Sequence, residues 1–183
     1  EIDKTSEDKI RTSYCYPAEI SHGLFGNLLK KNPDYIFIPH ISSMDLKSDD
    51  RYSRLCVFVQ SESFYLQSSF ASEIKSKILN PYIDFSKGIE EIKKSFIQIG
   101  EMLGRTFLDS EKAFDEAYSK YIQMNLEFKE RGRQILDELE NSPDKFALVL
   151  FGRAYNAFAS EANLNIPHKF ASKNILIIPH DFI

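Results

Sequence analysis

Hydrophobic residues at the start of the chain recur with two different periods, and each period predicts one kind of element. Apolar side chains follow Pro17 at intervals of four, which predicts an amphipathic helix over Pro17–Lys31. This helix should end before Asn32-Pro33, because the residue that precedes a proline disfavours helical backbone angles. The aromatic and β-branched run Asp34–Pro39 then predicts a short buried strand.

The next stretch is polar at first, then apolar, and then has the spacing of hydrophobic residues that is typical of a helix. Ser42–Ser53 is polar and charged, which predicts a surface loop. Leu55–Val59 is rich in apolar and β-branched residues and predicts a second strand. A helix over Ser61–Leu79 follows in this interpretation, with Ser61 as its N-cap.

The longest periodic stretches lie in the middle of the chain. Gly88–Arg105 and Ser110–Asn141 each place apolar residues along one helical stripe, which predicts two helices that pack as an antiparallel hairpin. We expect four side chains to be buried between these helices or against the sheet: Ile92, Phe96, Tyr121 and Phe128.

The remaining sequence predicts a β–α–β unit. Phe146–Phe151 is a continuous apolar run, typical of a strand buried on both faces, and Ile175–Ile178 predicts another strand. The turn Gly152–Asn156 and a short helix near Pro167–Ser172 lie between them. Apolar strands separated by helices indicate an α/β protein with a mostly parallel sheet, here with the long helical hairpin as an insertion.

The pattern also suggests how the chain is organised. We expect residues 1–183 to be one α/β fragment of a larger protein, because there is no initiator methionine and a core strand closes the sequence. The expected parts are an α/β part at 9–85, the helical hairpin at 86–142 and the β–α–β part at 143–183.

Composition narrows the classes of partner. A net charge of −4 and a pI near 5.6 argue against a nucleic-acid partner, which needs a basic face. The apolar runs are much shorter than the roughly 20 residues that cross a bilayer, so no membrane span is expected. Two cysteines without a secretory signal indicate reduced thiols and a cytoplasmic location.

The cysteines are the first candidates for chemistry. Cys15 lies two residues before the predicted helix at Pro17, where free N–H groups and the helix dipole stabilise a thiolate. Cys56 lies beside a predicted strand and just ahead of a predicted helix. No C-x-x-C motif is present, so the residues by themselves favour inert buried thiols over metal ligands.

The four histidines lack the fixed spacing of a metal site. They are His22, His40, His168 and His180, and we interpret all four as hydrogen-bonded structural residues.

A third candidate is the turn that follows the strand Phe146–Phe151. Gly152, Arg153 and Asn156 could direct backbone N–H groups and a guanidinium towards a phosphate or an adenosine tail. A purely structural strand-to-helix turn, in which Gly152 permits the backbone conformation, is the alternative that the residues favour.

Three separated motifs resemble those of the CoA-substrate-specific enzyme activases. The matching segments are Ser13-Tyr-Cys-Tyr-Pro-Ala-Glu-Ile-Ser-His-Gly23 with Asp34-Tyr-Ile-Phe-Ile-Pro39, then Leu55-Cys-Val-Phe-Val-Gln60, and finally Phe151-Gly-Arg-Ala-Tyr-Asn156 with Asn163-Leu-Asn-Ile-Pro167 and Ile177-Ile-Pro179. Their order and spacing agree with the family. The chain departs from it at three positions: Glu19 replaces a common lysine, Ala154 a usual proline and Asn165 a usual glycine.

The resemblance carries specific expectations. Members are similar to the cluster-bearing subunits of 2-hydroxyacyl-CoA dehydratases, so it implies a Rossmann-like fold and a [4Fe–4S] cluster that serves in electron transfer. Cys15 and Cys56 would be the first two cluster ligands, and a third cysteine would follow beyond Ile183. The fragment itself would lack the cluster and would not be catalytic.

The resemblance also implies partners. An ATPase module of a different fold, or a dehydratase-like redox partner, would act with this chain, and an acyl-CoA is a further possible ligand. Nothing here resembles the phosphate-binding segments of that ATPase, so we expect no ATP hydrolysis. The alternative function is a non-catalytic Rossmann-like interaction module, or an acyl-CoA- or nucleotide-binding module, with inert cysteines.

Overall fold

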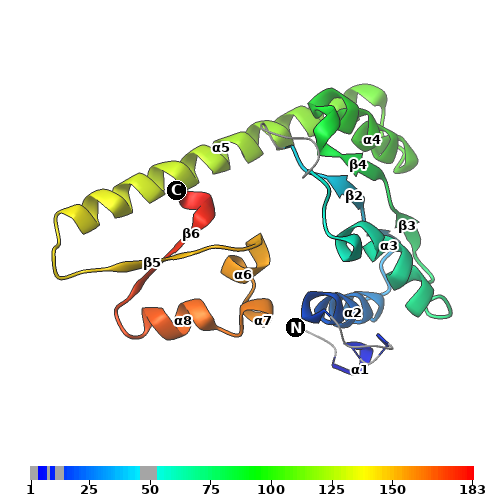
Figure 1. Cartoon of the computed structure of the whole chain (residues 1–183). Coiled ribbons are helices and arrows are strands. Elements are labelled where there is room, and N and C mark those ends of the chain that lie inside the picture. The colour runs from blue at the N-terminus through cyan, green and yellow to red at the C-terminus, as the bar shows by residue number, and fades with distance from the viewer. Residues whose placement is uncertain (1–3, 8, 11–14, 46–52) are drawn as a thin grey trace. The chain divides into compact units, whose positions relative to one another are not determined.

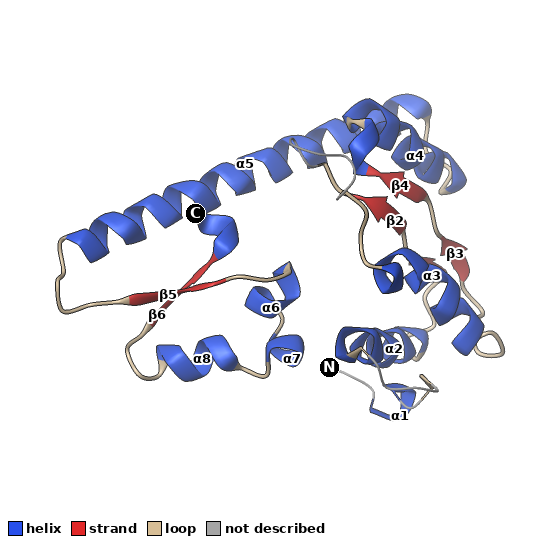
Figure 2. Cartoon of the chain, viewed as in Figure 1, coloured by secondary structure: helices blue, strands red, loops and turns tan. Residues whose placement is uncertain are grey.

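Helices and short apolar strands alternate along the chain, as the hydrophobic pattern predicts (Figure 2). The structure is a computed structural model that describes residues 4–7, 9–10, 15–45 and 53–183. It divides into two units, Glu1–Asp115 and Glu116–Ile183, whose boundary falls within one long helix (Figure 1). The protein is therefore of mixed α/β class, and each unit is described by itself.

The strands of the first unit form a parallel two-stranded ribbon. β1 (Tyr35–Phe37) continues into β2 (His40–Ser43), and β3 (Lys77–Leu79) continues into β4 (Tyr82–Asp84). β1 pairs with β3 and β2 pairs with β4, both in parallel. A proline interrupts each strand at the junction, because proline has no N–H to donate to the ladder.

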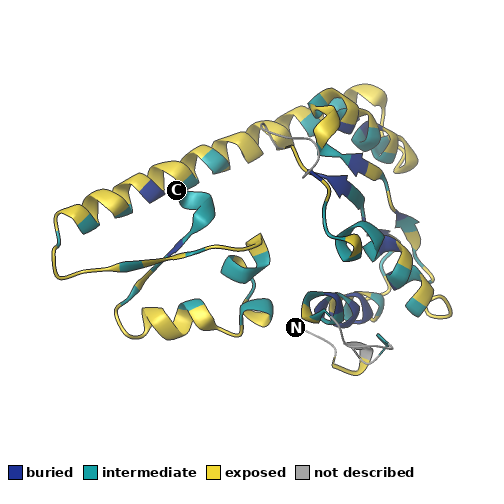
Figure 3. Cartoon of the chain, viewed as in Figure 1, coloured by how far each residue is buried: buried dark blue, intermediate teal, exposed yellow. Residues whose placement is uncertain are grey.

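Helices cover this ribbon and close a core. They are α1 (Lys4–Glu7), α2 (Tyr16–Leu29), α3 (Val57–Ser69) and α4 (Ile89–Met102), with the short helix η2 (Phe85–Lys87) before α4. The central cluster of buried side chains consists of Phe25, Ile36, Ile38, Leu66 and Phe70. Figure 3 shows buried stretches, in dark blue, in α2 and in the strands of this unit.

The predicted strand Leu55–Val59 is wrong, because α3 begins at Val57. Strand pairing stops earlier, where the Leu55 N–H donates to the Ser42 carbonyl at 2.9 Å. Ser61, the expected N-cap, lies inside the helix and its hydroxyl donates to the Val57 carbonyl at 2.7 Å. Short apolar runs fit a strand or a helix equally well, which explains the error.

The end of that predicted helix also needs correction. α3 ends at Ser69, and Lys77–Leu79 is strand β3. Strand β4 was not predicted, and η2 follows it directly. Residues 46–52 of the predicted surface loop lie outside the described residues.

α5 (Phe107–Glu140) is the long helix that the sequence predicts, and its first turns pack antiparallel to α4. The Lys93 ammonium lies 2.9 Å from an Asp115 carboxylate oxygen, and the Phe96 and Phe114 ring centroids are 5.5 Å apart. A Cβ on Gly100 would lie 2.0 Å from the Ser110 hydroxyl oxygen, so the two helices touch closely there. The hairpin is confined to these first turns, since α4 is much shorter than α5.

The short overlap of α4 and α5 explains which of the four side chains that we expected to be buried are covered. Ile92 is buried and Phe96 is half-buried, but Tyr121 is 52% exposed, so its predicted burial is wrong. Phe128 is half-buried and packs in the second unit, with its ring centroid 4.7 Å from that of Phe182.

The second unit contains the predicted β–α–β arrangement. β5 (Ala147–Leu150) and β6 (Leu176–Pro179) pair in parallel, and three short helices connect them: α6 (Ala154–Phe158), α7 (Ser160–Asn163) and α8 (Ile166–Ala171). η3 (His180–Phe182) follows β6.

The prediction that β5 is buried on both faces is wrong. Leu148 and Val149 point to opposite faces of the strand and are 39% and 37% exposed. Within residues 116–183, all of which the structure describes, Ile178 is the buried hydrophobic side chain. The helices of this unit therefore leave both faces of its two strands partly open.

Gly132 is the point where the chain end meets α5. It is buried, and a Cβ there would lie 1.7 Å from the Phe182 carbonyl oxygen. Only a residue without a side chain allows η3 to approach the helix this closely. Across the described residues, no helix combines the length and the apolar character that a membrane span requires.

Candidate functional site

Cys56 lies where the chain enters α3, beside the end of β2. On one side, the Leu55 N–H is bonded to the Ser42 carbonyl, and the Gln60 side-chain amide donates to the Leu55 carbonyl at 2.6 Å. On the other side, Cys56 is the N-cap of α3, and its carbonyl accepts from the Gln60 N–H at 3.0 Å. The backbone is therefore held on both sides of this half-buried residue.

Cys15 has the same relation to α2. It is the N-cap of that helix, with extended backbone angles of φ −153° and ψ 102°, and it is half-buried. Its carbonyl accepts from the N–H groups of Ala18 at 2.9 Å and Glu19 at 3.2 Å. Pro17 lies in the first turn, as predicted. The motif residues Ser13 and Tyr14 lie outside the described part of the chain.

A row of polar side chains joins α2 to α3, and we call it the polar seam: Ser21, His22, Glu62, Tyr65 and Ser69. The Ser21 and Tyr65 hydroxyl oxygens are 3.1 Å apart, and Ser21 also bonds the Glu62 carboxylate. His22 Nε2 lies 3.2 Å from the Ser69 hydroxyl oxygen. The contacts advance in the same direction along both helices, so α2 and α3 run parallel.

This register fixes which ends of the helices meet. Cys15 precedes Ser21 by six residues, and Cys56 precedes Glu62 by six residues. Both cysteines precede the contacts that join the helices, although not at one level, since the His22–Ser69 contact lies seven residues after Cys15 and 13 residues after Cys56. Both cysteines therefore belong to one end of the helix pair. Cys56 lies beside the last residues of β2, because the Leu55 N–H is bonded to the Ser42 carbonyl.

Both side chains are thiols at helix N-termini. The first turn of a helix leaves backbone N–H groups that can donate hydrogen bonds to a sulfur ligand placed beside them. Two thiolates together offer soft donors to iron or another soft metal. Among the residues that the structure describes, no three His, Cys, Asp or Glu side chains converge as a metal site.

Glu62 is a residue that the sequence reading missed. Burial raises the pKa of its carboxyl above the ordinary value, and the hydrogen bond from Ser21 lowers it. The predicted helix Ser61–Leu79 contains Glu62, Tyr65 and Ser69 at a spacing that places them on one helical face, but the sequence does not show that α2 packs against this face.

Two of the histidines have structural contacts, as predicted. His22 is 2% exposed, and its Nδ1 donates to the Ala18 carbonyl at 2.7 Å. His40 makes edge-to-face contacts with the rings of Phe64 and Tyr82, with centroids 5.3 and 5.1 Å away. Neither arrangement resembles a metal site.

The second candidate site follows β5 in the other unit. Gly152 has φ 152°, and a Cβ there would lie 2.6 Å from the Asn156 side-chain nitrogen. The Asn156 N–H donates to the Arg153 carbonyl at 2.8 Å, which closes the turn. The conformation and the close Asn156 contact both explain the glycine at this position.

The chain end of β6 brings His180 to this turn, where it meets Phe151 at the end of β5. Leu150 of β5 is in register with Pro179 of β6, so Phe151 and His180 leave the same edge of the sheet. Their rings are stacked with centroids 6.0 Å apart, and Phe151 is 78% exposed. The exposed Arg153 follows Phe151 by two residues. An aromatic platform and a guanidinium thus adjoin the carboxyl ends of these parallel strands, where ligands of such sheets bind.

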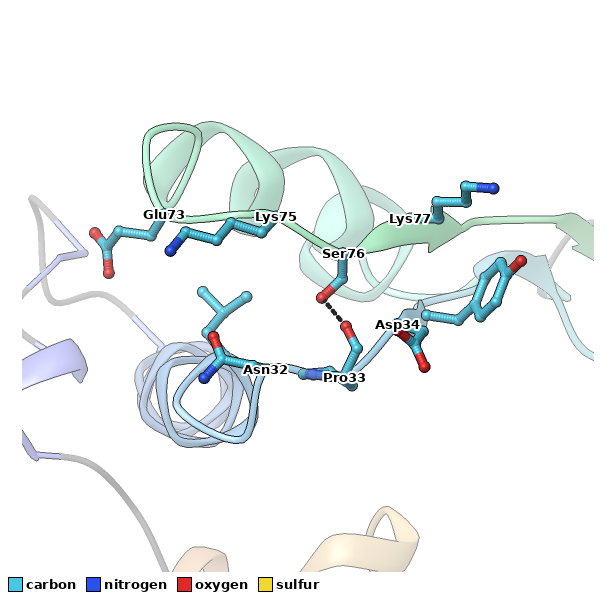
Figure 4. A pocket seen from close by; sticks show the side chains of 9 residues that line it. Asn32, Pro33, Asp34, Glu73, Lys75, Ser76 and Lys77 are labelled. Carbon is cyan, nitrogen blue, oxygen red and sulfur yellow. Dashed lines mark hydrogen bonds between the residues drawn. The ribbon is translucent and has the colours of Figure 1, made fainter.

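A hollow of about 460 Å³ lies elsewhere in the first unit, beside the starts of β1 and β3 (Figure 4). Charged side chains of both signs line it, including Asp34, Glu73, Lys75 and Lys77. The Ser76 hydroxyl donates to the Pro33 carbonyl across its floor. The hollow adjoins the amino ends of the strands and includes neither cysteine.

Comparison with known proteins gives one match. The family model described as CoA enzyme activase uncharacterised domain matches residues 1–183, which is the full length of the sequence. This match confirms the resemblance that the three sequence motifs indicate. No curated protein and no solved structure matches the chain.

Proposed function

The chain belongs to the CoA enzyme activase domain family, and we propose that Cys15 and Cys56 supply thiolate ligands to an iron–sulfur cluster used in electron transfer. Family membership by itself supports an activase-related role. The cluster, of the [4Fe–4S] type that the sequence resemblance implies, is the further step.

One observation carries the proposal: both cysteines are N-caps of neighbouring parallel helices. A shared helix end brings two anion-stabilising termini together, which an inert pair of buried thiols would not need. The alternative of inert thiols predicts no relation between the two positions. Forty-one residues separate them in the sequence, so local structure does not explain their common placement.

The donor set fits part of such a cluster. Two thiolates are half of the four that a [4Fe–4S] cluster takes, and the described residues offer no third metal-ligating neighbour. We therefore place the remaining ligands outside this chain, in the larger protein of which we propose it to be a piece. When bound, a cluster of this kind passes single electrons.

The chain's own contribution would be binding and tuning. The first-turn N–H groups of α2 and α3 can donate hydrogen bonds to sulfur and stabilise negative charge there. Half-burial of Cys15 and Cys56 limits access of water to the thiolates. Both effects act on the stability of the bound group without requiring catalysis by this chain.

The wider assignment follows from the same family. We propose a Rossmann-like arrangement, supported by parallel strand pairs connected through helices in both units. An ATPase module or a dehydratase-like redox partner would exchange electrons with this chain, in the reducing cytoplasm that free thiols favour. The chain itself would not hydrolyse ATP.

Iron and acid-labile sulfide, measured per chain after anaerobic reconstitution of the longer protein, test the proposal. Cys15→Ser and Cys56→Ser should each lower both values strongly, because a serine hydroxyl is not the soft, anionic donor that iron–sulfur sites use. Ser68→Ala, on the exposed face of α3, is the matched control and should retain full loading. Full loading in both cysteine variants would overturn the proposal.

A specific observation in the second unit favours one alternative, a module that binds an acyl-CoA or a nucleotide while the cysteines remain inert. The exposed Phe151 ring, stacked on His180 and followed by Arg153, could accept an adenine ring and a phosphate. Calorimetric titration with ADP and with CoA tests it. Arg153→Ala should abolish binding and Arg131→Ala, on the exposed side of α5, should not.

A further inference from the structure

We infer that the polar seam fixes how α2 packs against α3 and that His22 is the positioning residue which holds the Cys15 and Cys56 ends of the two helices together. This inference rests on the proposed function, because it concerns the geometry of the same two thiols. It adds a role for side chains that lie at least six residues along the sequence from either cysteine.

His22 is tied to both helices at once. Its Nδ1 donates to the Ala18 carbonyl of its own helix at 2.7 Å, which fixes the ring orientation. Its Nε2 then reaches the Ser69 hydroxyl of α3 at 3.2 Å. The ring also lies nearly parallel to that of Tyr65, with an interplanar angle of 7° and centroids 5.1 Å apart.

Polar contacts suit this task better than apolar ones. A buried polar group that loses its partner costs the free energy of an unmade hydrogen bond, and this cost adds to any loss of apolar packing. The neighbouring apolar contact is the edge-to-face pair Phe25 and Phe70, with centroids 5.1 Å apart. That pair buries apolar surface between the helices, while the hydrogen bonds of the seam favour one alignment of α2 along α3.

A shift of α2 along α3 would also move the cysteines relative to each other, because a helix moves as a stiff rod. A slip of one turn between α2 and α3 would shift one thiol by about 5.4 Å along the axis relative to the other. Thiolates that share one metal group tolerate no such shift. Correct register at Ser21, His22 and Ser69 is therefore a condition for the two N-caps to act together.

Short-range cross-linking of the two thiols in this chain measures the register directly. Dibromobimane, which joins only nearby thiols, should link Cys15 to Cys56 in the wild type. His22→Phe keeps an aromatic ring but loses both hydrogen bonds, so the cross-linking rate should fall about fivefold to tenfold. His22→Gln, whose amide oxygen can accept from the Ser69 hydroxyl near the Nε2 position, should restore most of the rate.

Controls separate register from folding and thiol reactivity. Ser69→Ala removes only the hydroxyl on α3 and should slow cross-linking as His22→Phe does, which keeps the test valid if the larger change unfolds the chain. Ser68→Ala, one residue away on the exposed face, should have no effect. Single-thiol alkylation by monobromobimane should be the same in all variants.

The outcomes distinguish the two proposals. No cross-link in the wild type would remove the shared-ligand function and the register role together. A wild-type cross-link that persists at full rate in both His22→Phe and Ser69→Ala would overturn only the register role. Loss in both variants, with rescue by His22→Gln, is the result expected.

Discussion

The two units contain the same kind of parallel strand pair but differ in how far that pair is covered. In the first unit, buried side chains come from α2, α3, α4 and the strands, and Phe70 at the end of α3 is 0% exposed. In the second unit, Ile178 is the buried hydrophobic residue within residues 116–183, while Phe146, Phe151 and Leu164 are all more than half exposed. Figure 3 shows this contrast between buried and exposed positions.

The two units differ in the length of the helices that pack on their strands. In the first unit, helices α2 and α3 have 14 and 13 residues, long enough to lay an apolar face across the ribbon. The connection between β5 and β6 is made of helices of four to six residues, which are too short to do so. Parallel strands need cover on both faces, so the second unit has a more open core.

The largest expected loss of stability comes from a substitution in the closed core of the first unit. Phe70→Ala should lower the free energy of unfolding by about 3–5 kcal/mol, because it removes a fully buried ring and leaves a cavity. Phe151→Ala, the same change at a 78% exposed position of the second unit, should alter it by less than about 0.5 kcal/mol. Urea unfolding of both variants measures the contrast, and equal losses would contradict it.

A smaller effect is expected where the second unit does pack tightly. Gly132→Ala would put a methyl group 1.7 Å from the Phe182 backbone oxygen, so η3 must move away from α5. The cost should be about 1–3 kcal/mol, typical of overpacking at a close contact. Ser119→Ala, at an exposed position of the same helix, is the control.

Hydrogen exchange locates this effect. Amides of residues 180–183 should exchange faster in Gly132→Ala, while amides of β1 and β3 should be unchanged. Unaltered exchange at the chain end would mean that the close approach does not hold η3 in place.

Much of the secondary structure followed from local pattern. The helices over 89–102 and 107–140 were predicted because charged and apolar residues alternate over many turns, which leaves no other interpretation. The start of α3 was not predicted, because the five apolar residues Leu55–Val59 fit a strand as well as a helix. β4 has only three residues and depends on pairing with β2, a long-range contact that local pattern does not contain.

The sequence proposes the cysteines of the candidate site but does not show their setting. Motif resemblance identified Cys15 and Cys56, whereas the seam that relates them depends on packing between two helices. Asn165, which replaces a family glycine, has φ 56°, a conformation that asparagine tolerates better than most residues. The burial of Tyr121 was misjudged because a stripe does not reveal how far the partner helix extends.

The smallest expected effect concerns the one ionisable carboxylate in the seam of the closed unit. Burial raises the pKa of Glu62 in the folded protein above its ordinary value, although the Ser21 hydroxyl partly offsets this. The folded state then binds more protons than the unfolded state between the two pKa values, so the free energy of unfolding falls as pH rises through that window. Glu62→Gln cannot ionise and should escape this loss.

Denaturant unfolding of wild type and Glu62→Gln across pH tests the sign. The variant should be the more stable one at neutral pH, and the difference should shrink as pH falls through the raised pKa and vanish below the ordinary value. Glu116→Gln, on the exposed surface of α5, should show no such trend. A difference that grows as the pH falls would mean that the seam stabilises the charged carboxylate, and that the interior of the closed unit is more polar at this helix contact than its buried neighbours indicate.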